Sequence, residues 1–261
     1  MWVVGKVLAK IDGESVGVKL TQREREHIFA ERGGFGGGGK GEILRQVILG
    51  GQDGLVNVLG IVLGVATATM DASVIIIAGI AATVAESLSM GAVAYTSSRA
   101  EQDHYWAELE KEKREIREMP EIEKKEIELV YYKKGFRGKA LASIVRHITS
   151  DEKLWLDVMM NEELGLADAK NINPAKEALV VGLASFGGSL MPLAPFVLVA
   201  DVQSAMVASA ALSLLTLFVA GAIKAKITIG NWAKSGLEML AIGGLAGIAG
   251  YAVGALLGVK N

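Results

Sequence analysis

The sequence predicts an all-α membrane protein with five transmembrane helices per subunit and a helical insertion between the second and the third. Three observations predict this fold class. Hydrophobic residues make up 51% of the 261 residues, five stretches have the length and apolar character of membrane spans, and a densely charged region separates the second span from the third. A water-soluble domain of this length would rarely be so apolar.

The five predicted spans are each long enough to cross a hydrocarbon core of about 30 Å, which takes about 20 helical residues. The residues Met70–Ala72 and Asp201 connect neighbouring spans so tightly that two hairpins result. The spans cover residues 46–69, 73–95, 177–200, 202–223 and 236–258.

Lysine and arginine gather at one set of span ends, whereas the two hairpin connections carry neither. Because positive charge marks the cytoplasmic side of a membrane protein, the N-terminus and the insertion are expected in the cytoplasm. Five crossings then place the C-terminus on the opposite side. The basic residues are Lys40, Arg45, Arg99, Lys170, Lys176, Lys224, Lys226 and Lys234. The expected parts are a tail with a glycine-rich linker (1–40), spans one and two (41–95), the insertion (96–175) and spans three to five (176–261).

The tail gives the weakest signals. A helix is expected near residues 21–31, followed by a glycine tract at 33–39. A phosphate-binding loop would need a preceding strand and a following Gly-Lys-Ser/Thr, and the sequence has neither. The tract is therefore interpreted as a flexible linker.

The insertion is expected to be helical. Apolar residues recur at roughly helical spacing over 101–132, and the second span could run into this helix without a break. Pro120 is expected to end one helix and begin the next, because proline fits the first turn of a helix. A third helix is expected over 150–165, from a Ser-Asp cap to a glycine. In the third span, Pro192 and Pro195 are expected to break the helix and provide a hinge.

Composition removes several classes of function. The chain has no cysteine and three histidines, so thiolate chemistry is excluded and an imidazole-rich metal centre is not expected. The net charge of −2 does not give the excess of positive charge that is typical of nucleic-acid-binding proteins. No prosthetic group is expected. The chemistry that remains is that of carboxylates and methionine thioethers.

Two acids interrupt the first two spans. Asp53 shares a helix face with Asn57, Glu86 shares one with Met90, and Gln52 adjoins Asp53. At 1.5 Å per residue, Asp53 lies about 10 Å from the inner end of its helix, and the pair on the returning span lies at a similar depth. Charge at this depth usually marks an ion or proton path, so these residues are predicted to line a pore for a divalent cation. The alternative is that the acids only stabilise helix packing and that the methionine is a core filler.

Two Glu-x-x-Glu pairs flank Pro120, and a Met-Met-x-x-Glu segment follows in the third insertion helix. Residues three apart project from one side of a helix, so each pair can offer two carboxylates to one ion. Carboxylates favour ions such as Fe²⁺ and Mn²⁺, and thioethers favour softer ones. The alternative is a solvated helix surface. The candidate metal ligands are Glu112, Glu115, Glu123, Glu126, Met159, Met160 and Glu163.

Two Glu-x-x-His spacings, Glu24/His27 and Glu101/His104, are of the kind found in di-iron carboxylate bundles. The first lies in the tail, and the soluble four-helix pattern of such bundles is missing. A membrane-anchored carboxylate iron oxidase is therefore an alternative rather than the main hypothesis.

Four motifs, in their order and spacing, resemble the vacuolar iron transporter family over about residues 42–258. They are Gln52-Asp53-Gly54-Leu55-Val56, Ser89-Met90-Gly91, Glu101-Gln102-Asp103-His104-Tyr105 and Met191-Pro192-Leu193-Ala194-Pro195-Phe196. The resemblance implies a homodimer of five-helix subunits in the bilayer with a pore at the two-fold interface, and a transporter rather than an enzyme. Family members move Fe²⁺, often Mn²⁺ too, out of the cytosol in exchange for protons.

The resemblance also implies roles for particular residues. The seven candidate ligands of the insertion match the family's cytoplasmic metal-binding domain, Asp53 matches its pore acid and Met90 its pore methionine. The chain departs from the eukaryotic pattern at Ala82, where those members carry a glutamate eight residues before the methionine. Glu86, one turn later on the same face, could replace it. The membrane would be the plasma membrane in a prokaryote and the vacuolar membrane in a eukaryote.

The sequence thus predicts a proton-coupled antiporter that exports Fe²⁺, and also Mn²⁺, from the cytosol. The insertion would collect the ion and pass it to Asp53, Glu86 and Met90 in the pore. Two alternatives stay open: the iron oxidase, and a metal-sensing membrane protein that conducts nothing.

Overall fold

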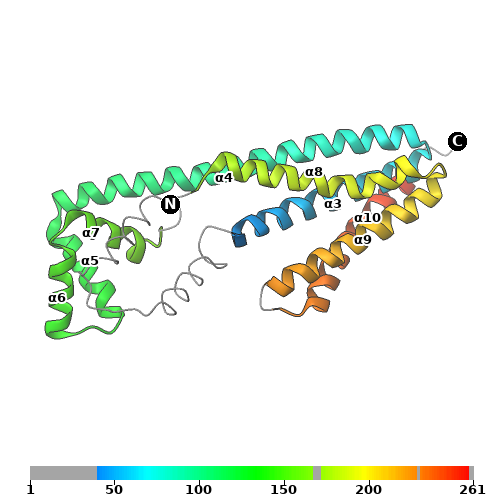
Figure 1. Ribbon diagram of the computed structural model, residues 1–261. Helices are drawn as coiled ribbons and strands as arrows, with labels where there is room; N and C mark the ends of the chain where they lie inside the picture. Colours follow the sequence, from blue (N-terminus) through cyan, green and yellow to red (C-terminus); the bar gives the residue numbers. More distant parts are fainter. Residues whose placement is uncertain (1–39, 167–171, 228–229, 259–261) are drawn as a thin grey trace, which may run out of the picture. The chain divides into compact units, whose positions relative to one another are not determined.

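Five long α-helices form most of the computed structural model: α3 (Lys40–Thr69), α4 (Ala72–Glu118), α8 (Pro174–Leu198), α9 (Val202–Ile227) and α10 (Trp232–Leu257) (Figure 1). Each has a stretch long and apolar enough to cross a membrane, which confirms the five predicted spans. The structure describes residues 40–166, 172–227 and 230–258. The predicted helix near 21–31, the glycine tract and the Glu24/His27 pair lie outside these residues. From residue 43 onward the helices belong to one compact unit.

An aspartate in each hairpin connection caps the helix that follows. Asp71 accepts hydrogen bonds from the backbone N–H groups of Ser73 and Val74 at 2.8 and 3.3 Å. Asp201 accepts one from the backbone N–H of Ser204 at 2.8 Å. A capping carboxylate satisfies N–H groups that have no partner within the helix. The acidity of both connections therefore has a structural cause.

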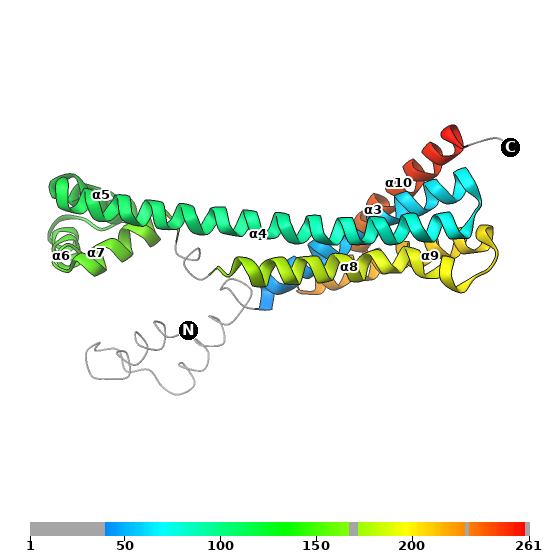
Figure 2. The ribbon, with the colours of Figure 1, turned by 90° about the horizontal axis from the view of Figure 1, so that it is seen from above.

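The second predicted span is the first part of a much longer helix. α4 packs along α8 and continues without a break to Glu118, well past the predicted end of the span at residue 95 (Figure 2). Charged residues end a membrane span, but Glu, Lys and Arg are good helix formers and do not end a helix. A single helix thus joins the membrane-spanning part to the insertion.

The rest of the insertion consists of α5 (Pro120–Lys133), α6 (Gly138–Ile148), α7 (Glu152–Val158) and the π-helical turn η1 (Met159–Glu163). Pro120 begins α5 and Asp151 caps α7, both as predicted. The sequence analysis did not predict α6. It also predicted one continuous helix where α7 passes into η1.

The predicted break in the third span is wrong. Pro192 and Pro195 lie inside α8, which runs on to Leu198. Each proline removes one N–H donor and with it one backbone hydrogen bond of the helix, but the helix continues past both positions. Ser209 of α9 donates a 2.6 Å hydrogen bond to the Pro192 carbonyl oxygen, which ties this part of α8 to its neighbour.

The backbone of α3 touches the backbones of two other helices. A Cβ added to Gly188 of α8 would lie 2.0 Å from the carbonyl oxygen of Gly51, and one added to Gly254 of α10 would lie 2.1 Å from that of Gly64. Small residues at helix crossings permit such close packing in membranes. These contacts fix α3 in place, and with it Asp53, two residues after the first crossing.

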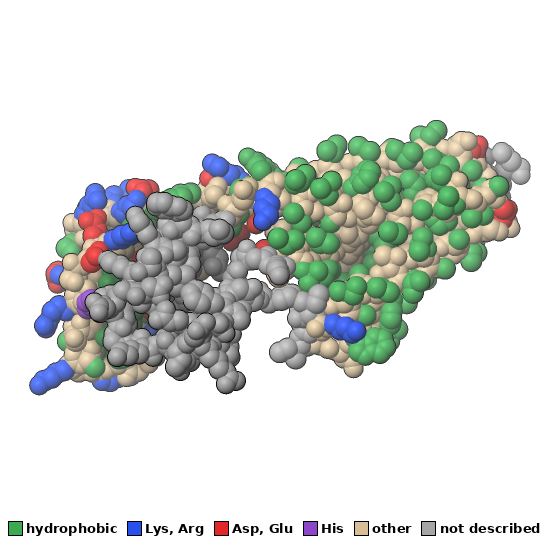
Figure 3. Space-filling view, in the orientation of Figure 1, with side chains coloured by type: hydrophobic (Ala, Val, Ile, Leu, Met, Phe, Trp, Pro, Cys, Tyr) green, Lys and Arg blue, Asp and Glu red, His purple; other side chains and the backbone are tan. Residues whose placement is uncertain are grey.

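The surface of the described residues divides by chemistry. Over the five long helices the visible face is largely hydrophobic, whereas charged side chains gather over the insertion (Figure 3). Leu88 and Leu183, for example, are 70% and 62% exposed. Such a surface suits lipid rather than water. The insertion has a hydrophobic core of its own around Ile127 and Trp155.

Candidate functional site

The two predicted Glu-x-x-Glu pairs lie on adjoining helices. Glu112 and Glu115 belong to the last two turns of α4, and Glu123 and Glu126 belong to the first two turns of α5. Met119 alone separates the two helices. The ends of α4 and α5, and the two pairs with them, are therefore held next to each other.

Two of these carboxylates are buried without a full set of partners. Glu112 and Glu123 are each 3% exposed. Their Oε2 atoms have no hydrogen-bond partner among the described residues. A buried charged oxygen without a partner is unfavourable. A bound cation would remove this cost.

The pKa values show that the glutamates of α4, α5 and η1 share one environment. Burial, followed by repulsion from Glu126 and Glu112, raises the pKa of Glu123 to about 7. Burial, followed by repulsion from the same two residues, raises the pKa of Glu163 to about 7, although that residue as a whole is exposed. Burial, followed by repulsion from Glu115, raises the pKa of Glu112. These five glutamates are called the carboxylate cluster below.

Met159 and Met160 fill hydrophobic space beside the carboxylate cluster. Met159 is fully buried in the core that contains Trp155, and Met160 packs with Tyr105. The turn is one residue wider than an α-helix, since the Leu164 N–H bonds to the Met159 carbonyl oxygen at 3.0 Å. Turns of this kind are frequent at functional sites. Hydrophobic packing accounts for the burial of both methionines, so the acids carry the charge chemistry of the site.

The acids of the carboxylate cluster are spread too far apart to coordinate one ion together. Within residues 40–166, 172–227 and 230–258, no three His, Asp or Glu side chains lie close enough to enclose one ion. A divalent cation would have to draw the carboxylates together. Lys111 competes with such an ion, because its Nζ already lies 3.4 Å from Glu108 Oε2 and 3.7 Å from Glu115 Oε2.

Glu108 and Lys111 were not among the residues predicted for this site. Glu108, Glu112 and Glu115 follow one another at intervals of four and three residues, so they lie on one face of α4. That spacing is the signal that could have extended the cluster by one acid. Lys111 could not be told from Lys113, the other lysine of α4, because both lie in the same run of alternating Glu and Lys residues.

The neighbouring acid Glu162 has a different role from Glu163. It accepts a hydrogen bond from the Tyr131 hydroxyl at 3.2 Å and pairs with Lys134. Both partners belong to the end of α5, one in its last turn and the other capping it. Glu162 thus fastens η1 to α5, whereas Glu163 belongs to the carboxylate cluster.

In the membrane-spanning part, Asp53 and Asn57 of α3 meet Glu86 of α4. The Glu86 carboxyl group lies within hydrogen-bonding distance of Asp53 and also interacts with Asn57. Asp53 and Glu86 are half-buried, and Asn57 is exposed. Three polar groups therefore come together at the surface of an apolar helix pair.

The other predicted pore residues lie apart from this contact. Gln52 lines an apolar cavity of about 320 Å³ together with Gly188 and Leu217, on another side of α3. Met90 is half-buried, one turn beyond Glu86. Ala82 packs against the hydrophobic core of the membrane-spanning helices.

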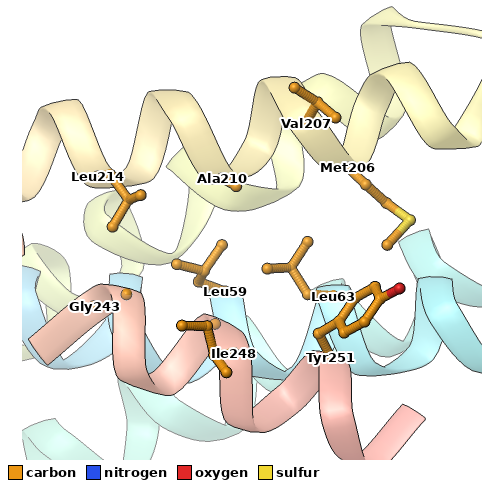
Figure 4. Close-up of a pocket in the computed structure, with 11 residues that line it drawn as sticks. Leu59, Leu63, Met206, Val207, Ala210, Leu214, Gly243, Ile248 and Tyr251 are labelled. Carbon is orange, nitrogen blue, oxygen red and sulfur yellow. The ribbon is translucent and has the colours of Figure 1, made fainter. Parts of the chain in front are cut away.

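A second cavity, of about 380 Å³, lies between α3, α9 and α10 (Figure 4). Apolar side chains such as Leu59, Met206 and Ile248 line it, and its lining includes no charged residue. It offers no carboxylate to a cation.

The Glu101/His104 pair of the oxidase alternative is exposed on α4. No His, Asp or Glu group able to enclose an ion includes either residue within the described part of the chain. The structure thus groups the acids of the insertion in one place and the acids of the first two spans in another. Glu101 and His104 belong to neither group.

Comparison with known proteins gives a consistent set of matches. A family model described as the VIT family matches residues 44–255. Vacuolar iron transporter 1 of Tulipa gesneriana is 34% identical over 234 residues, which cover 90% of this chain and 91% of that protein. Vacuolar iron transporter 1 of Arabidopsis thaliana is 32% identical over 211 residues, covering 81% and 84%. Protein CCC1 of Saccharomyces cerevisiae is 28% identical over 224 residues, covering 83% and 69%. The family match includes the carboxylate cluster and the contact between Asp53 and Glu86.

Proposed function

This chain belongs to the VIT family and transports iron across a membrane; from that premise we propose that it is a proton-coupled antiporter that exports Fe²⁺, and also Mn²⁺, from the cytosol. Its relatives are named as transporters, so the chain is not an enzyme, and iron is its cargo. Glu and Asp oxygens, the ligands available here, suit both ions.

The observation that carries the proposal is the meeting of Asp53 and Glu86 between two membrane-spanning helices. Two carboxyl groups within hydrogen-bonding distance repel each other strongly unless a proton or a cation lies between them. Ionisable side chains within a membrane span cost free energy, and those that occur there usually have a function. Asn57 adds a neutral oxygen, and Met90 adds a thioether one turn away.

The carboxylate cluster supplies the ion from the cytosolic side. Its buried, unpartnered oxygens on Glu112 and Glu123 favour a cation, and the long helix α4 carries both this cluster and Glu86. Ions captured by the insertion are then passed to the acids of the spans.

Proton exchange follows from the same carboxylates. With pKa values of about 7, Glu123 and Glu163 hold protons or metal according to small changes in pH. Metal binding to such groups releases protons, and protons displace metal. A proton gradient can therefore drive the release of the ion.

A second copy of the chain completes the pore in this proposal. Asn57 is exposed on the apolar surface of α3, and the two acids beside it are only half-buried. Polar side chains do not face lipid in membrane proteins; they face the bundle interior or a water-filled cavity. A homodimer with α3 and α4 at its interface removes this conflict. The basic span ends support a cytosolic N-terminus and a cytosolic insertion.

The test is uptake into proteoliposomes that contain the purified full chain. We expect Fe²⁺ and Mn²⁺ to enter vesicles with an acidic interior when the insertion faces outward, and uptake to slow when the gradient is collapsed. Glu115→Ala should slow uptake at low metal concentration and leave the fold intact. Metal binding without flux would support the non-conducting sensor instead, and uptake indifferent to the gradient would overturn the antiport.

A further inference from the structure

We propose that Lys111 is a built-in counter-ion of the carboxylate cluster, which occupies the acids in the absence of metal and speeds the release of a bound ion. The inference rests on the proposed metal binding by the insertion and adds to it a residue that sets affinity and exchange rate.

The contacts of Lys111 are with acids of the cluster and its extension on α4. Its Nζ lies 3.4 Å from Glu108 Oε2, 3.7 Å from Glu115 Oε2 and 4.0 Å from Glu112 Oε1. Glu112 is the most buried of the three acids, with a side chain that is 4% exposed. One ammonium group therefore lies among three carboxylates that a metal ion would also need.

The charge of Lys111 reaches beyond the residues that it touches. It lowers the pKa of Glu163, with which it forms no ion pair, against the larger effects of burial, Glu126 and Glu112. The lysine therefore offsets part of the mutual repulsion while no metal is bound. Once a divalent cation binds the same oxygens, the lysine becomes a like charge beside it, and the two repel each other.

Lysine is suited to leave the site. Its side chain is 46% exposed, and it carries a compact, well-hydrated charge on a flexible stem. The head group can swing into water when metal arrives and return when metal leaves. This movement favours release of the ion. The returning ammonium group restores part of the attraction that the carboxylates lose when the metal leaves.

Lys113 provides a matched control. It lies two residues further along the same helix, with its Nζ 2.5 Å from Glu110 Oε1, and neither residue belongs to the carboxylate cluster. Removing its charge changes the net charge of the chain by the same amount as removing that of Lys111. Only the position of the charge differs.

The experiment titrates Mn²⁺ into the full chain in detergent and follows free Mn²⁺ by its paramagnetic resonance signal. We expect Lys111→Gln to bind Mn²⁺ about tenfold more tightly than the wild type at low salt and to release it more slowly into excess chelator. Lys113→Gln should match the wild type, and Lys111→Arg, which keeps the charge, should not bind more tightly than the wild type. A merely structural lysine would weaken binding when removed, so a gain in affinity distinguishes the two roles.

Two results would overturn the inference, and they can be told apart. In the first, the wild type binds Mn²⁺ and Glu123→Gln abolishes this binding, but Lys111→Gln binds no more tightly than the wild type. This result would reject only the role of Lys111. Wild-type protein that binds no Mn²⁺, or binds it independently of Glu123, would reject the carboxylate cluster as a metal site and the role of the lysine with it.

Discussion

The carboxyl groups of Asp53 on α3 and Glu86 on α4 lie within hydrogen-bonding distance of each other, although both belong to helices of membrane-spanning length. The two helices form a hairpin, and Asp71 in its connection caps α4. The backbone contact of Gly51 with Gly188 holds α3 against α8. The acid pair is therefore fixed by helix packing rather than by its own attraction. A proton or a cation between the two groups relieves their repulsion, which is the physical basis for exchanging one for the other.

The two neighbouring acids of η1 should behave differently when neutralised. Glu163→Gln should weaken Mn²⁺ binding by about tenfold or more, because it removes a charge from the carboxylate cluster. Glu162→Gln should leave binding nearly unchanged and lower the stability of the insertion by about 1 kcal/mol, because Glu162 bonds to Tyr131 and Lys134 instead. Titration and thermal unfolding of both variants check this. Equal losses of affinity would contradict the separate roles.

The metal-free chain should lose stability as the pH rises from 4.5 to 7. Glu123 and Glu163, with pKa values of about 7 against an ordinary value of 4.5, hold protons in the folded chain that the unfolded chain has already released. The folded form binds more protons in this window, so its free energy of unfolding falls as the pH rises. Thermal unfolding at several pH values in the presence of EDTA checks this. Glu123→Gln should flatten the decline, and a wild type that is no steeper than this variant would contradict the prediction.

Metal binding should have the opposite dependence on pH. A cation must displace the protons of Glu123 and Glu163, so affinity for Mn²⁺ should rise as the pH passes through 7, by up to about tenfold per pH unit for each proton displaced. Calorimetric titration in buffers of different ionisation enthalpy measures the protons released. Affinity that is flat between pH 6 and 8, with no protons released, would argue against carboxylate ligation at this cluster.

Adjacent glycines of α8 should tolerate alanine very differently. Gly188→Ala places a Cβ 2.0 Å from the Gly51 carbonyl oxygen, whereas nothing lies within 4 Å of a Cβ at Gly187. Overpacking against backbone should destabilise the first by about 3 kcal/mol, and Gly187→Ala should change stability by less than about 0.5 kcal/mol. Thermal unfolding in one detergent compares them. Similar melting temperatures would mean that α3 and α8 do not touch at this crossing.

Local chemistry explains which parts of the fold the sequence could predict. Span length, the start of α5 at Pro120 and the Asp151 cap depend on a few adjacent residues, and all three are confirmed. α6 was missed because its 11 residues lie between turns and give a short pattern. The helix break at Pro192 was wrongly predicted because the hydrogen bond that Ser209 of α9 donates to the Pro192 carbonyl oxygen is a tertiary contact.

The candidate site shows the same division. Spacing alone predicted the pairs Glu112/Glu115 and Glu123/Glu126, since residues three apart share a helix face. It also selected Glu163 from the Met-Met-x-x-Glu segment, but it gave no role to Glu162, whose partners Tyr131 and Lys134 are tertiary contacts. Nor could it separate Lys111 from Lys113, the other lysine of α4, since the distances of Lys111 to three acids depend on side-chain packing.

The most direct test of the central claim is Fe²⁺ uptake by Asp53→Asn in proteoliposomes with an acidic interior. We predict that uptake falls to the level of empty vesicles, while Mn²⁺ binding to the insertion stays at the wild-type value. Glu238→Gln serves as the control, because Glu238 is an exposed acid in the second turn of α10, and it should transport like the wild type. Full uptake by Asp53→Asn would show that the acids of the first two spans do not carry the ion.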